Sequence, residues 1–207
     1  VSKNSWFSGV PYSTTSDDWV IAHKLETTAF NSDVAQMSNA LFCVNDNGNV
    51  GIGISSPVAK LHVYQNDTEV DTEAGVTIEQ DGTGDAALSF LLTGTKRWRM
   101  GIDNSDSDKF KISDSTNLAS NNKLTIDTSG NVGIGTTNPQ RELHVHASNY
   151  TDIQLTNDTT GTGSGDGSTI SATDNDLYLN NKESGNLLLY TSNSEKMRIT
   201  SAGRVGI

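Results

Sequence analysis

The stretch Gly130-Asn131-Val132-Gly133-Ile134-Gly135-Thr136-Thr137-Asn138-Pro139, followed by Leu143-His144-Val145, governs the interpretation of this chain because much of it occurs more than once. An earlier copy reads Gly48-Asn49-Val50-Gly51-Ile52-Gly53, with Pro57 and Leu61-His62-Val63 after it. The last residues, Gly203-Arg204-Val205-Gly206-Ile207, open a third copy. We call this stretch the anchor motif. Self-similarity of this kind indicates a repeat protein.

A weaker repeat precedes the anchor motif. Trp6-Phe7-Ser8-Gly9-Val10 matches Trp98-Arg99-Met100-Gly101-Ile102 at the Trp, the Gly and the aliphatic residue, and Trp19-Val20-Ile21 takes the place of Phe110-Lys111-Ile112. We therefore expect a partial N-terminal module over residues 1–53, a full module over 41–135 and a C-terminally truncated module over 123–207. The copies are spaced more widely than the roughly 20 to 50 residues of solenoid repeats, so each is expected to be a small β module.

The composition favours β modules with small cores. Only 33% of the 207 residues are hydrophobic and 6% are aromatic, which is little for one large core. Disorder is the alternative, but the apolar residues fall in short alternating runs bounded by turn residues, as in strands. We predict an all-β chain without substantial helix, whose cores are completed by other copies of itself. The one helix candidate, Lys24 to Met37, has poor apolar spacing.

Within a module the pattern predicts strand, tight turn, strand. Leu124-Thr125-Ile126 alternates apolar and polar residues, Asp127 to Gly130 turns the chain, and Val132 to Gly135 alternates again with glycine on the second face. Glycine weakens a strand unless another backbone approaches closely. We therefore expect chains or sheets to crowd together at four glycines, with a proline ending each strand: Gly51, Gly53, Gly133, Gly135, Pro57 and Pro139.

One segment varies between the copies. It follows the matching stretches Val76-Thr77-Ile78 and Ile153-Gln154-Leu155. It is Leu88 to Leu92 in one module and the glycine-rich Gly161 to Gly167 in the other. Variation in length and composition is typical of surface connections.

Charge excludes several partners. The formal net charge of -11, from 14 basic and 25 acidic residues, argues against nucleic acid and against an anionic membrane face. No apolar run approaches the roughly 18 residues of a spanning helix, so no membrane insertion is expected. The single cysteine, Cys43, excludes an internal disulfide framework.

The candidate binding motifs have structural explanations. Gly-x-x-Gly-x-Gly lacks the order and the following helix of a dinucleotide fingerprint. Asn45 to Asn49 resembles half of a calcium loop, but its copies, Asp127 to Asn131 and Thr200 to Arg204, change the carboxylates and keep the glycine. The persistent feature is therefore a turn, and we expect no cofactor.

His144 and His146 are the metal candidates. Two residues apart on a strand, both rings face one side, and three copies around an axis would offer six imidazoles to a transition metal. Against this, Leu143 and Val145 are the expected inward residues and the earlier copy has Tyr64 beside His62. Cys43 corresponds to polar residues, so we expect it to be exposed. No carboxylate pair or activated nucleophile recurs between the copies, which argues against an enzyme.

The anchor motif with Leu-His-Val, preceded by Lys-Leu-Thr-Ile-Asp and interspersed with Trp-x-x-Gly-Ile segments, resembles the repeats of phage tail-fibre and related virion fibre proteins. In that family such repeats lie upstream of an endosialidase-type intramolecular chaperone domain. The resemblance covers residues 41–207 and, less closely, 6–40. The chaperone is absent from this sequence, so its self-cleaving residues have no counterpart.

The resemblance implies an elongated homotrimeric fibre of tandem β modules, intertwined or stacked from antiparallel strands. It implies a shaft or collar segment of a bacteriophage tail or capsid fibre, a structural viral protein that projects a receptor-binding tip for host attachment. Its partners would be its own copies, other fibre or virion proteins at its ends, and a host surface glycan contacted through the variable loops. The alternative is a receptor-binding or adhesin fragment of a phage-like injection system or a bacterial surface fibre.

Overall fold

The computed structural model describes residues 4–11, 17–25, 40–65, 75–94 and 96–207, and across these ranges the regular structure is β apart from one short 3-10 helix. The all-β prediction is thereby confirmed. The candidate helix from Lys24 begins inside a strand that reaches Leu25, and residues 26–39 lie outside the described ranges. Within those ranges no helix has the length and apolarity to cross a membrane. The chain divides into two units, Val1–Thr77 and Ile78–Ile207, which are described separately.

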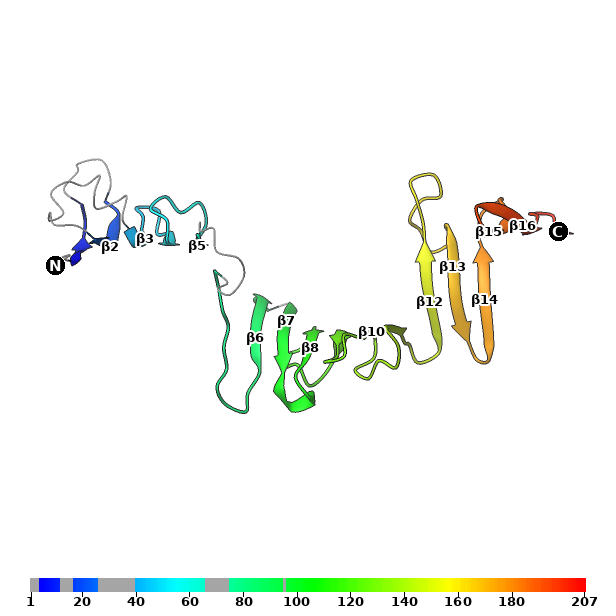
Figure 1. The fold of residues 1–207 in the computed structure, drawn as a ribbon, viewed down its shortest axis with the longest axis horizontal. Coiled ribbons are helices and arrows are strands. Elements are labelled where there is room, and N and C mark those ends of the chain that lie inside the picture. Colours follow the sequence, from blue (N-terminus) through cyan, green and yellow to red (C-terminus); the bar gives the residue numbers. More distant parts are fainter. Residues whose placement is uncertain (1–3, 12–16, 26–39, 66–74, 95) are drawn as a thin grey trace. The chain divides into compact units, whose positions relative to one another are not determined.

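The first unit contains one five-stranded sheet in the order β1-β2-β3-β4-β5 (Figure 1). Its strands are β1 (Asn4–Gly9), β2 (Trp19–Leu25), β3 (Ala40–Val44), β4 (Val50–Ile52) and β5 (Leu61–Val63). The first four strands pair antiparallel, whereas β5 pairs parallel to β4. The strands were expected to be antiparallel, so this parallel closing pair is a departure from the prediction.

The second unit opens with a six-stranded sheet in which β6 to β11 pair in chain order. Its elements are β6 (Ala86–Leu92), β7 (Lys96–Asp103), the 3-10 helix η1 (Asn104–Asp106), β8 (Lys109–Ser113), β9 (Asn122–Ile126), β10 (Val132–Ile134) and β11 (Leu143–Val145). The last pair, β10 and β11, is again parallel. Strands β1–β5 and β7–β11 thus follow one plan, with β6 added at the edge.

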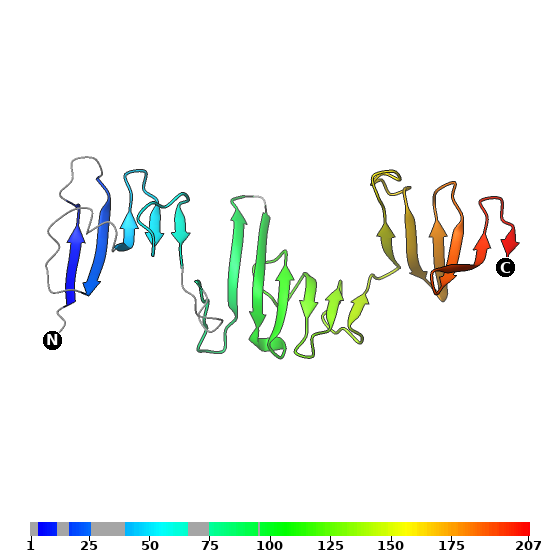
Figure 2. The same ribbon diagram turned by 45° about the horizontal axis from the view of Figure 1, so that its top comes forward.

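The remaining strands form two three-stranded sheets (Figure 2). One contains β12 (Tyr150–Leu155), β13 (Ser168–Thr173) and β14 (Asp176–Asn181), and the other contains β15 (Leu187–Thr191), β16 (Ser194–Ile199) and β17 (Val205–Gly206). The pairing of β16 with β17, Arg198 opposite Gly206, repeats the pairing of β9 with β10, Thr125 opposite Gly133.

The matched segments of the internal repeats pair in the same register. Gly9 lies opposite Val20 as Gly101 lies opposite Lys111, which supports the match between the Trp-x-x-Gly segments. Each copy also has a register shift at the corresponding place, after Ile21, after Ile112 and after Leu189. A bulge increases the local twist of a strand pair, so the three copies share this distortion as well as their pairing.

The structure differs from the sequence-based expectation for two segments and for the extent of the sheets. The segment Leu88 to Leu92, interpreted as a surface connection, lies in edge strand β6, because its apolar residues pair along β7. Val76 to Ile78, matched to Ile153 to Leu155 of β12, lies outside any strand and is exposed. The sheets also continue beyond Gly53 and Gly135, because the Leu-His-Val segments add the parallel strands.

Candidate functional site

Each anchor motif opens with a turn that satisfies its own backbone. Asn45 N donates to Asn49 O at 3.0 Å and Gly48 N to Asn45 O at 2.8 Å, and the later copy has the corresponding bonds from Asp127 and Gly130 at 3.0 and 2.9 Å. Gly48, Gly130 and Gly203 have φ of 70°, 85° and 78°, which favours glycine. These shared bonds support a structural turn rather than half of a calcium loop.

The first side chain of the turn also bonds the backbone. Asn45 Oδ1 accepts from the amides of Asn47 and Asn49 at 3.1 and 2.9 Å. Asp127 Oδ1 accepts from Ser129 and Asn131, both at 2.9 Å. The pKa of Asp127 lies below its usual value, chiefly because of the Asn131 amide. Amide, carboxylate or hydroxyl can therefore fill this position, which explains why the residue type changes between copies.

Close backbone approach at the anchor glycines is confirmed, and the partner belongs to the same chain. A Cβ on Gly51 would lie 2.3 Å from Ile54 O, and one on Gly133 would lie 2.5 Å from Thr136 O. Gly53 and Gly135, with φ of 72° and 73°, face the carbonyls of Tyr64 and His146 in the same way. The crowding was expected between chains or sheets, but at Gly51 and Gly133 the neighbour is the connection after the strand, and at Gly53 and Gly135 it is the residue after the parallel strand. Pro57 and Pro139 lie buried in these connections.

The other face of the six-stranded sheet is apolar and uncovered. Two cross-strand rows of six residues run over β6 to β11: Ala86, Ile102, Phe110, Ile126, Val132 and Leu143, and Leu88, Met100, Ile112, Leu124, Ile134 and Val145. All twelve side chains are half-buried or exposed. We call these two rows the apolar face; a sheet with such a face ordinarily packs against a second layer.

The same asymmetry recurs in the other sheets. In the first unit Trp19, Val44, Val50 and Leu61 form one row, and Ile21, Phe42, Ile52 and Val63 form the next. The β12–β14 sheet presents Ile153, Ile170 and Leu179, and the β15–β17 sheet presents Leu187, Ile199 and Val205. None of these side chains is buried. The buried residues lie on the opposite faces: they are apolar in the first unit, where Val20 and Cys43 are fully buried, and polar in the β12–β14 sheet, where Thr169 and Ser171 are 2% exposed.

The histidines lie on the face opposite Leu143 and Val145. His144 pairs with Gly133, and Gln140 N donates to its Nδ1 at 3.4 Å. The rings of His144 and His146 lie 6.2 Å apart between centroids. Among the described residues no group of three or more His, Cys, Asp or Glu side chains is arranged to hold a metal ion. An axis through the apolar face would therefore not meet these two rings.

Cys43 is buried, contrary to the expectation of exposure. It is fully buried beside Val20 and Ala40, and its Sγ donates to Ser55 O at 3.6 Å. Burial, followed by the charge of Asp18, raises the pKa of the thiol. The expectation failed because the face of β3 opposite Phe42 and Val44 is covered by the connection that follows β4.

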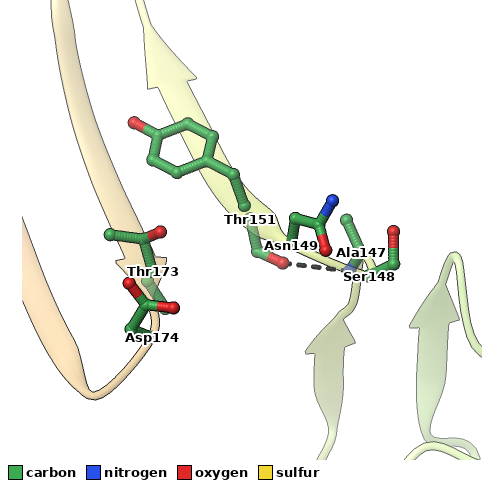
Figure 3. Close-up of a pocket in the computed structure, with 8 residues that line it drawn as sticks. Ala147, Ser148, Asn149, Thr151, Thr173 and Asp174 are labelled. Carbon is green, nitrogen blue, oxygen red and sulfur yellow. Dashed lines mark hydrogen bonds between the residues drawn. The ribbon is translucent and has the colours of Figure 1, made fainter.

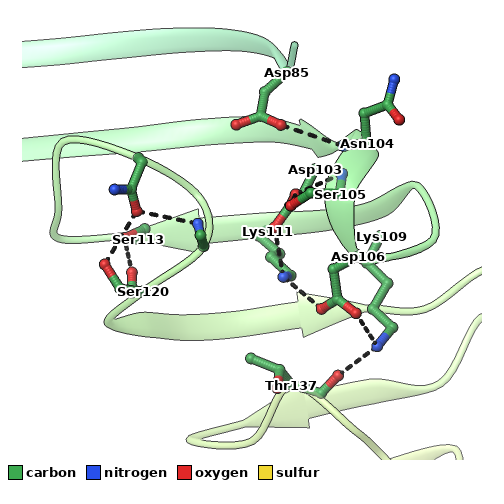
Figure 4. A network of polar contacts seen from close by, with 12 residues as sticks. Asp85, Asp103, Asn104, Ser105, Asp106, Lys109, Lys111, Ser113, Ser120 and Thr137 are labelled. Atoms are coloured by element: carbon green, nitrogen blue, oxygen red, sulfur yellow. Dashed lines mark hydrogen bonds and ion pairs between the residues drawn. The ribbon is translucent and has the colours of Figure 1, made fainter. Parts of the chain in front are cut away.

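A charged cluster occupies the corresponding place in the second unit (Figure 4). Lys111 Nζ lies 2.7 Å from Asp103 Oδ2 and 2.6 Å from Asp106 Oδ2, with Lys111 and Asp103 only 2% and 1% exposed. Ser105 donates to Asp103 Oδ1 from its backbone N at 3.0 Å and from its Oγ at 2.7 Å. Lys109 Nζ bonds Asp106 Oδ1 and Thr137 O, both at 2.9 Å. We call Asp103, Ser105, Asp106, Lys109 and Lys111 the buried ion cluster.

Before any reaction between its members, the pKa shifts in the cluster favour the ionised forms of its side chains. Burial opposes charge on Asp103, but the hydrogen bonds from Lys111 and Ser105 outweigh it and lower the pKa of the carboxyl. Asp106 behaves alike: burial opposes charge, while Lys111 and Lys109 lower the pKa. For Lys111 burial opposes charge, and the bonds to both carboxylates raise the pKa above its ordinary value. Sequence reasoning missed this cluster; its one signal was Lys111 standing where the first copy has Val20.

A polar cleft of about 490 Å³ lies at the base of the β12–β14 sheet (Figure 3). Ala147 N donates to Thr151 Oγ1 at 2.9 Å on one side, and Thr173 and Asp174 lie on the other. Tyr150 also lines the cleft, and its hydroxyl donates to Ser171 Oγ at 3.1 Å on the face opposite Ile153. The remaining lining residues are Ser148, Asn149 and Ala172.

Comparison with known proteins assigns no family to this chain. A scan against protein-family models gives no match, and a search of curated proteins gives none either.

Proposed function

We propose that this chain is a structural segment, a shaft or collar, of a homotrimeric virion fibre, and that it holds a receptor-binding tip away from the particle. The observation that carries the proposal is the uncovered apolar face, which recurs at corresponding strand positions in the three sheets that contain a copy of the anchor motif. A repeated face needs a repeated partner, and further copies of the same chain supply one.

Energetics favours association through these faces. Full burial of one Val, Leu, Ile, Phe or Met side chain contributes about 1.5 to 3 kcal/mol relative to exposure. The twelve side chains of the six-stranded sheet are already partly covered, so completing their burial contributes on the order of 10 kcal/mol. Association costs roughly 4 to 15 kcal/mol. With the other sheets added, assembly of copies is favourable.

The residues assign different roles to the two faces of each sheet. The Val and Ile side chains of the anchor motif pack between copies, while its glycines admit the chain's own connection on the opposite face. The glycines thus shape each module, and the intersubunit contact falls to the apolar face. The proposal includes no turnover of an external substrate.

The polar cleft favours a second function, that of a receptor-binding or adhesin module on a virion, an injection system or a bacterial surface. Its tyrosine ring and its carboxylate, amide and hydroxyl groups suit the apolar and polar faces of a sugar. The cleft lies at one end of the sheet, and its lining includes Tyr150 from the polar face and Thr151 and Ala172 from the face that carries Ile153 and Ile170. A glycan array with this chain distinguishes the functions, because specific binding contradicts a purely passive shaft.

Size-exclusion chromatography with light scattering tests the assembly. We expect a species of three times 22.1 kDa that persists on dilution into the nanomolar range. Electron microscopy of the same peak should show rods of uniform width. A stable monomer at micromolar concentration would overturn the fibre proposal, because the apolar faces would then be tolerated in water.

A further inference from the structure

The buried ion cluster is not required by the module that contains it. In the first copy, Val20 and Cys43 take the places of Lys111 and Thr125, and Pro11, also buried, follows Gly9 as Asp103 follows Gly101. In the third copy, Leu188 stands opposite Arg198 at the same register. Since buried ion pairs are often less stable than well-packed apolar residues, a module that folds with Val20 does not need Lys111. The cluster therefore calls for a chemical explanation.

Its groups are placed for a reaction between them. The amine of Lys111 lies 2.7 Å from Asp103 Oδ2, and both side chains are shielded from water. The other oxygen, Asp103 Oδ1, accepts two hydrogen bonds from Ser105, as the oxyanion of an acyl-transfer reaction would. Asp106 contacts the same amine at 2.6 Å, and Lys109 fixes its second oxygen. An amine, a polarised carboxyl group and a proton carrier are thus held together.

We propose that Lys111 and Asp103 condense to an intramolecular amide, a covalent cross-link between β7 and β8. A first proton passes from the Lys111 ammonium through Asp106 to Asp103 Oδ2, so that a neutral amine faces a neutral carboxyl group. The amine attacks Asp103 Cγ while the Ser105 donors stabilise the negative charge on Oδ1. The second proton of the amine then passes through Asp106 to Oδ2, which leaves as water. A new N–C bond replaces a C–O bond, one water is released, Asp106 is unchanged and no electrons are transferred.

Two features of the fold favour condensation over the reverse hydrolysis. Holding the amine and the carboxyl group in contact replaces a bimolecular encounter by a unimolecular step. This removes the entropic cost of the encounter, which is a large part of many reaction barriers. The burial of Lys111 and Asp103 keeps water from the reacting atoms and so slows the reverse hydrolysis. The ion pair described above is the reactant state, and proton transfer within the cluster yields the neutral amine without creating net charge. The reaction depends on this module alone and does not rest on the fibre proposal.

Mass spectrometry of the intact, denatured chain tests the cross-link. We expect a mass lower than that of the sequence by one water molecule. After trypsin digestion, the peptides 100–109 and 110–123 should appear as one linked species, because the acylated Lys111 is no longer a cleavage site. Cleavage after Lys111, together with the full sequence mass, would overturn the proposal.

Three variants separate the cross-link from other losses of water. Lys111→Arg keeps a cation for both carboxylates but has no reactive primary amine, so the full mass should return. Asp106→Asn removes the proton carrier and should also give the full mass in freshly folded protein. Lys123→Arg, whose side chain pairs with Asp114 outside the cluster, is the matched control and should keep the lower mass. Loss of water that persists in Lys111→Arg would place it elsewhere, for example in an aspartyl succinimide, and would contradict the proposal.

Discussion

The five-stranded sheet of the first unit and strands β7–β11 of the second are two versions of one module that differ most where they are most buried. Both have the same turn, the same bulge and the same parallel closing pair. Under the returning connection, however, one holds Val20 and Cys43, and the other holds Lys111 and Thr125. By contrast, the opposite face of the sheet is hydrophobic in both: it is the apolar face in the second unit and the corresponding rows that begin at Trp19 and Ile21 in the first.

The difference shows which residues define the module. Turn hydrogen bonds, the close approach at Gly51 and Gly133, and the apolar rows recur, so they are what the fold requires. The row beneath the connection accepts an apolar or an ionic filling provided that every buried charge has a partner. This row is where the two copies have been free to acquire separate chemistry.

The largest expected effect is on assembly. Ile134→Glu in the second unit and Ile52→Glu in the first each place a carboxylate on the apolar face, and we expect either variant to elute as a monomer. Thr128→Glu, in the exposed turn, is the matched control and should remain assembled. If only one of the two substitutions dissociates the protein, the two copies do not share the same kind of interface.

Exchange of the buried residues between the copies should cost stability in both directions. Val20→Lys buries an ammonium where Pro11 replaces the partner carboxylate, and Lys111→Val leaves Asp103 buried without its cation. Each should lower the free energy of unfolding by about 3 to 5 kcal/mol. Thermal or denaturant unfolding followed by the tryptophan signal measures the change. A neutral Val20→Lys variant would mean that the first copy can open its covered face to water.

The anchor glycines should be equally sensitive in the two copies. Gly133→Val and Gly51→Val drive a Cβ into a backbone carbonyl that cannot move independently, at a cost on the order of 3 kcal/mol. Gly130→Ala, whose Cβ meets nothing within 4 Å but whose φ is 85°, should cost about 1 kcal/mol. Because these residues contact their own chain, the loss should appear in unfolding experiments on any oligomeric form. Equal costs at Gly130 and Gly133 would contradict the close approach.

The smallest effect distinguishes the two turns by pH. The folded-state pKa of Asp127 is lowered, so its contribution to stability is complete above the unfolded value near 3.8 and is lost as pH falls through the lower folded value. Asn45 in the first copy does not titrate in this range. Hydrogen exchange at the Asn131 amide should therefore accelerate, relative to that at Asn49, as the pH falls below about 4. Asp127→Asn, which copies the first unit, should remove the difference.

The apolar face was predictable from the sequence and the covered face was not. Alternation places Val132 and Ile134 on one side of a strand, and repetition fixes their partners, so those strands were anticipated correctly. Cys43 was misplaced because polar equivalents such as Thr125 suggest solvent, whereas the returning connection buries that side. The pairing of Lys111 with Asp103 depends on a diagonal contact between neighbouring strands, which no local pattern specifies. The parallel strand at Leu143 was hidden because its connection is unusually short.

The uncovered apolar faces also constrain how the protein can be made. If copies assemble through these faces as proposed, a newly synthesised copy presents an apolar surface and unpaired strand edges until it binds further copies, and such species aggregate at micromolar concentrations. Productive assembly therefore competes with aggregation in time. Synthesis of several copies from one message, so that they emerge side by side, shortens the search. The yield of native protein should consequently rise when neighbouring ribosomes are closely spaced and fall when chains are released singly.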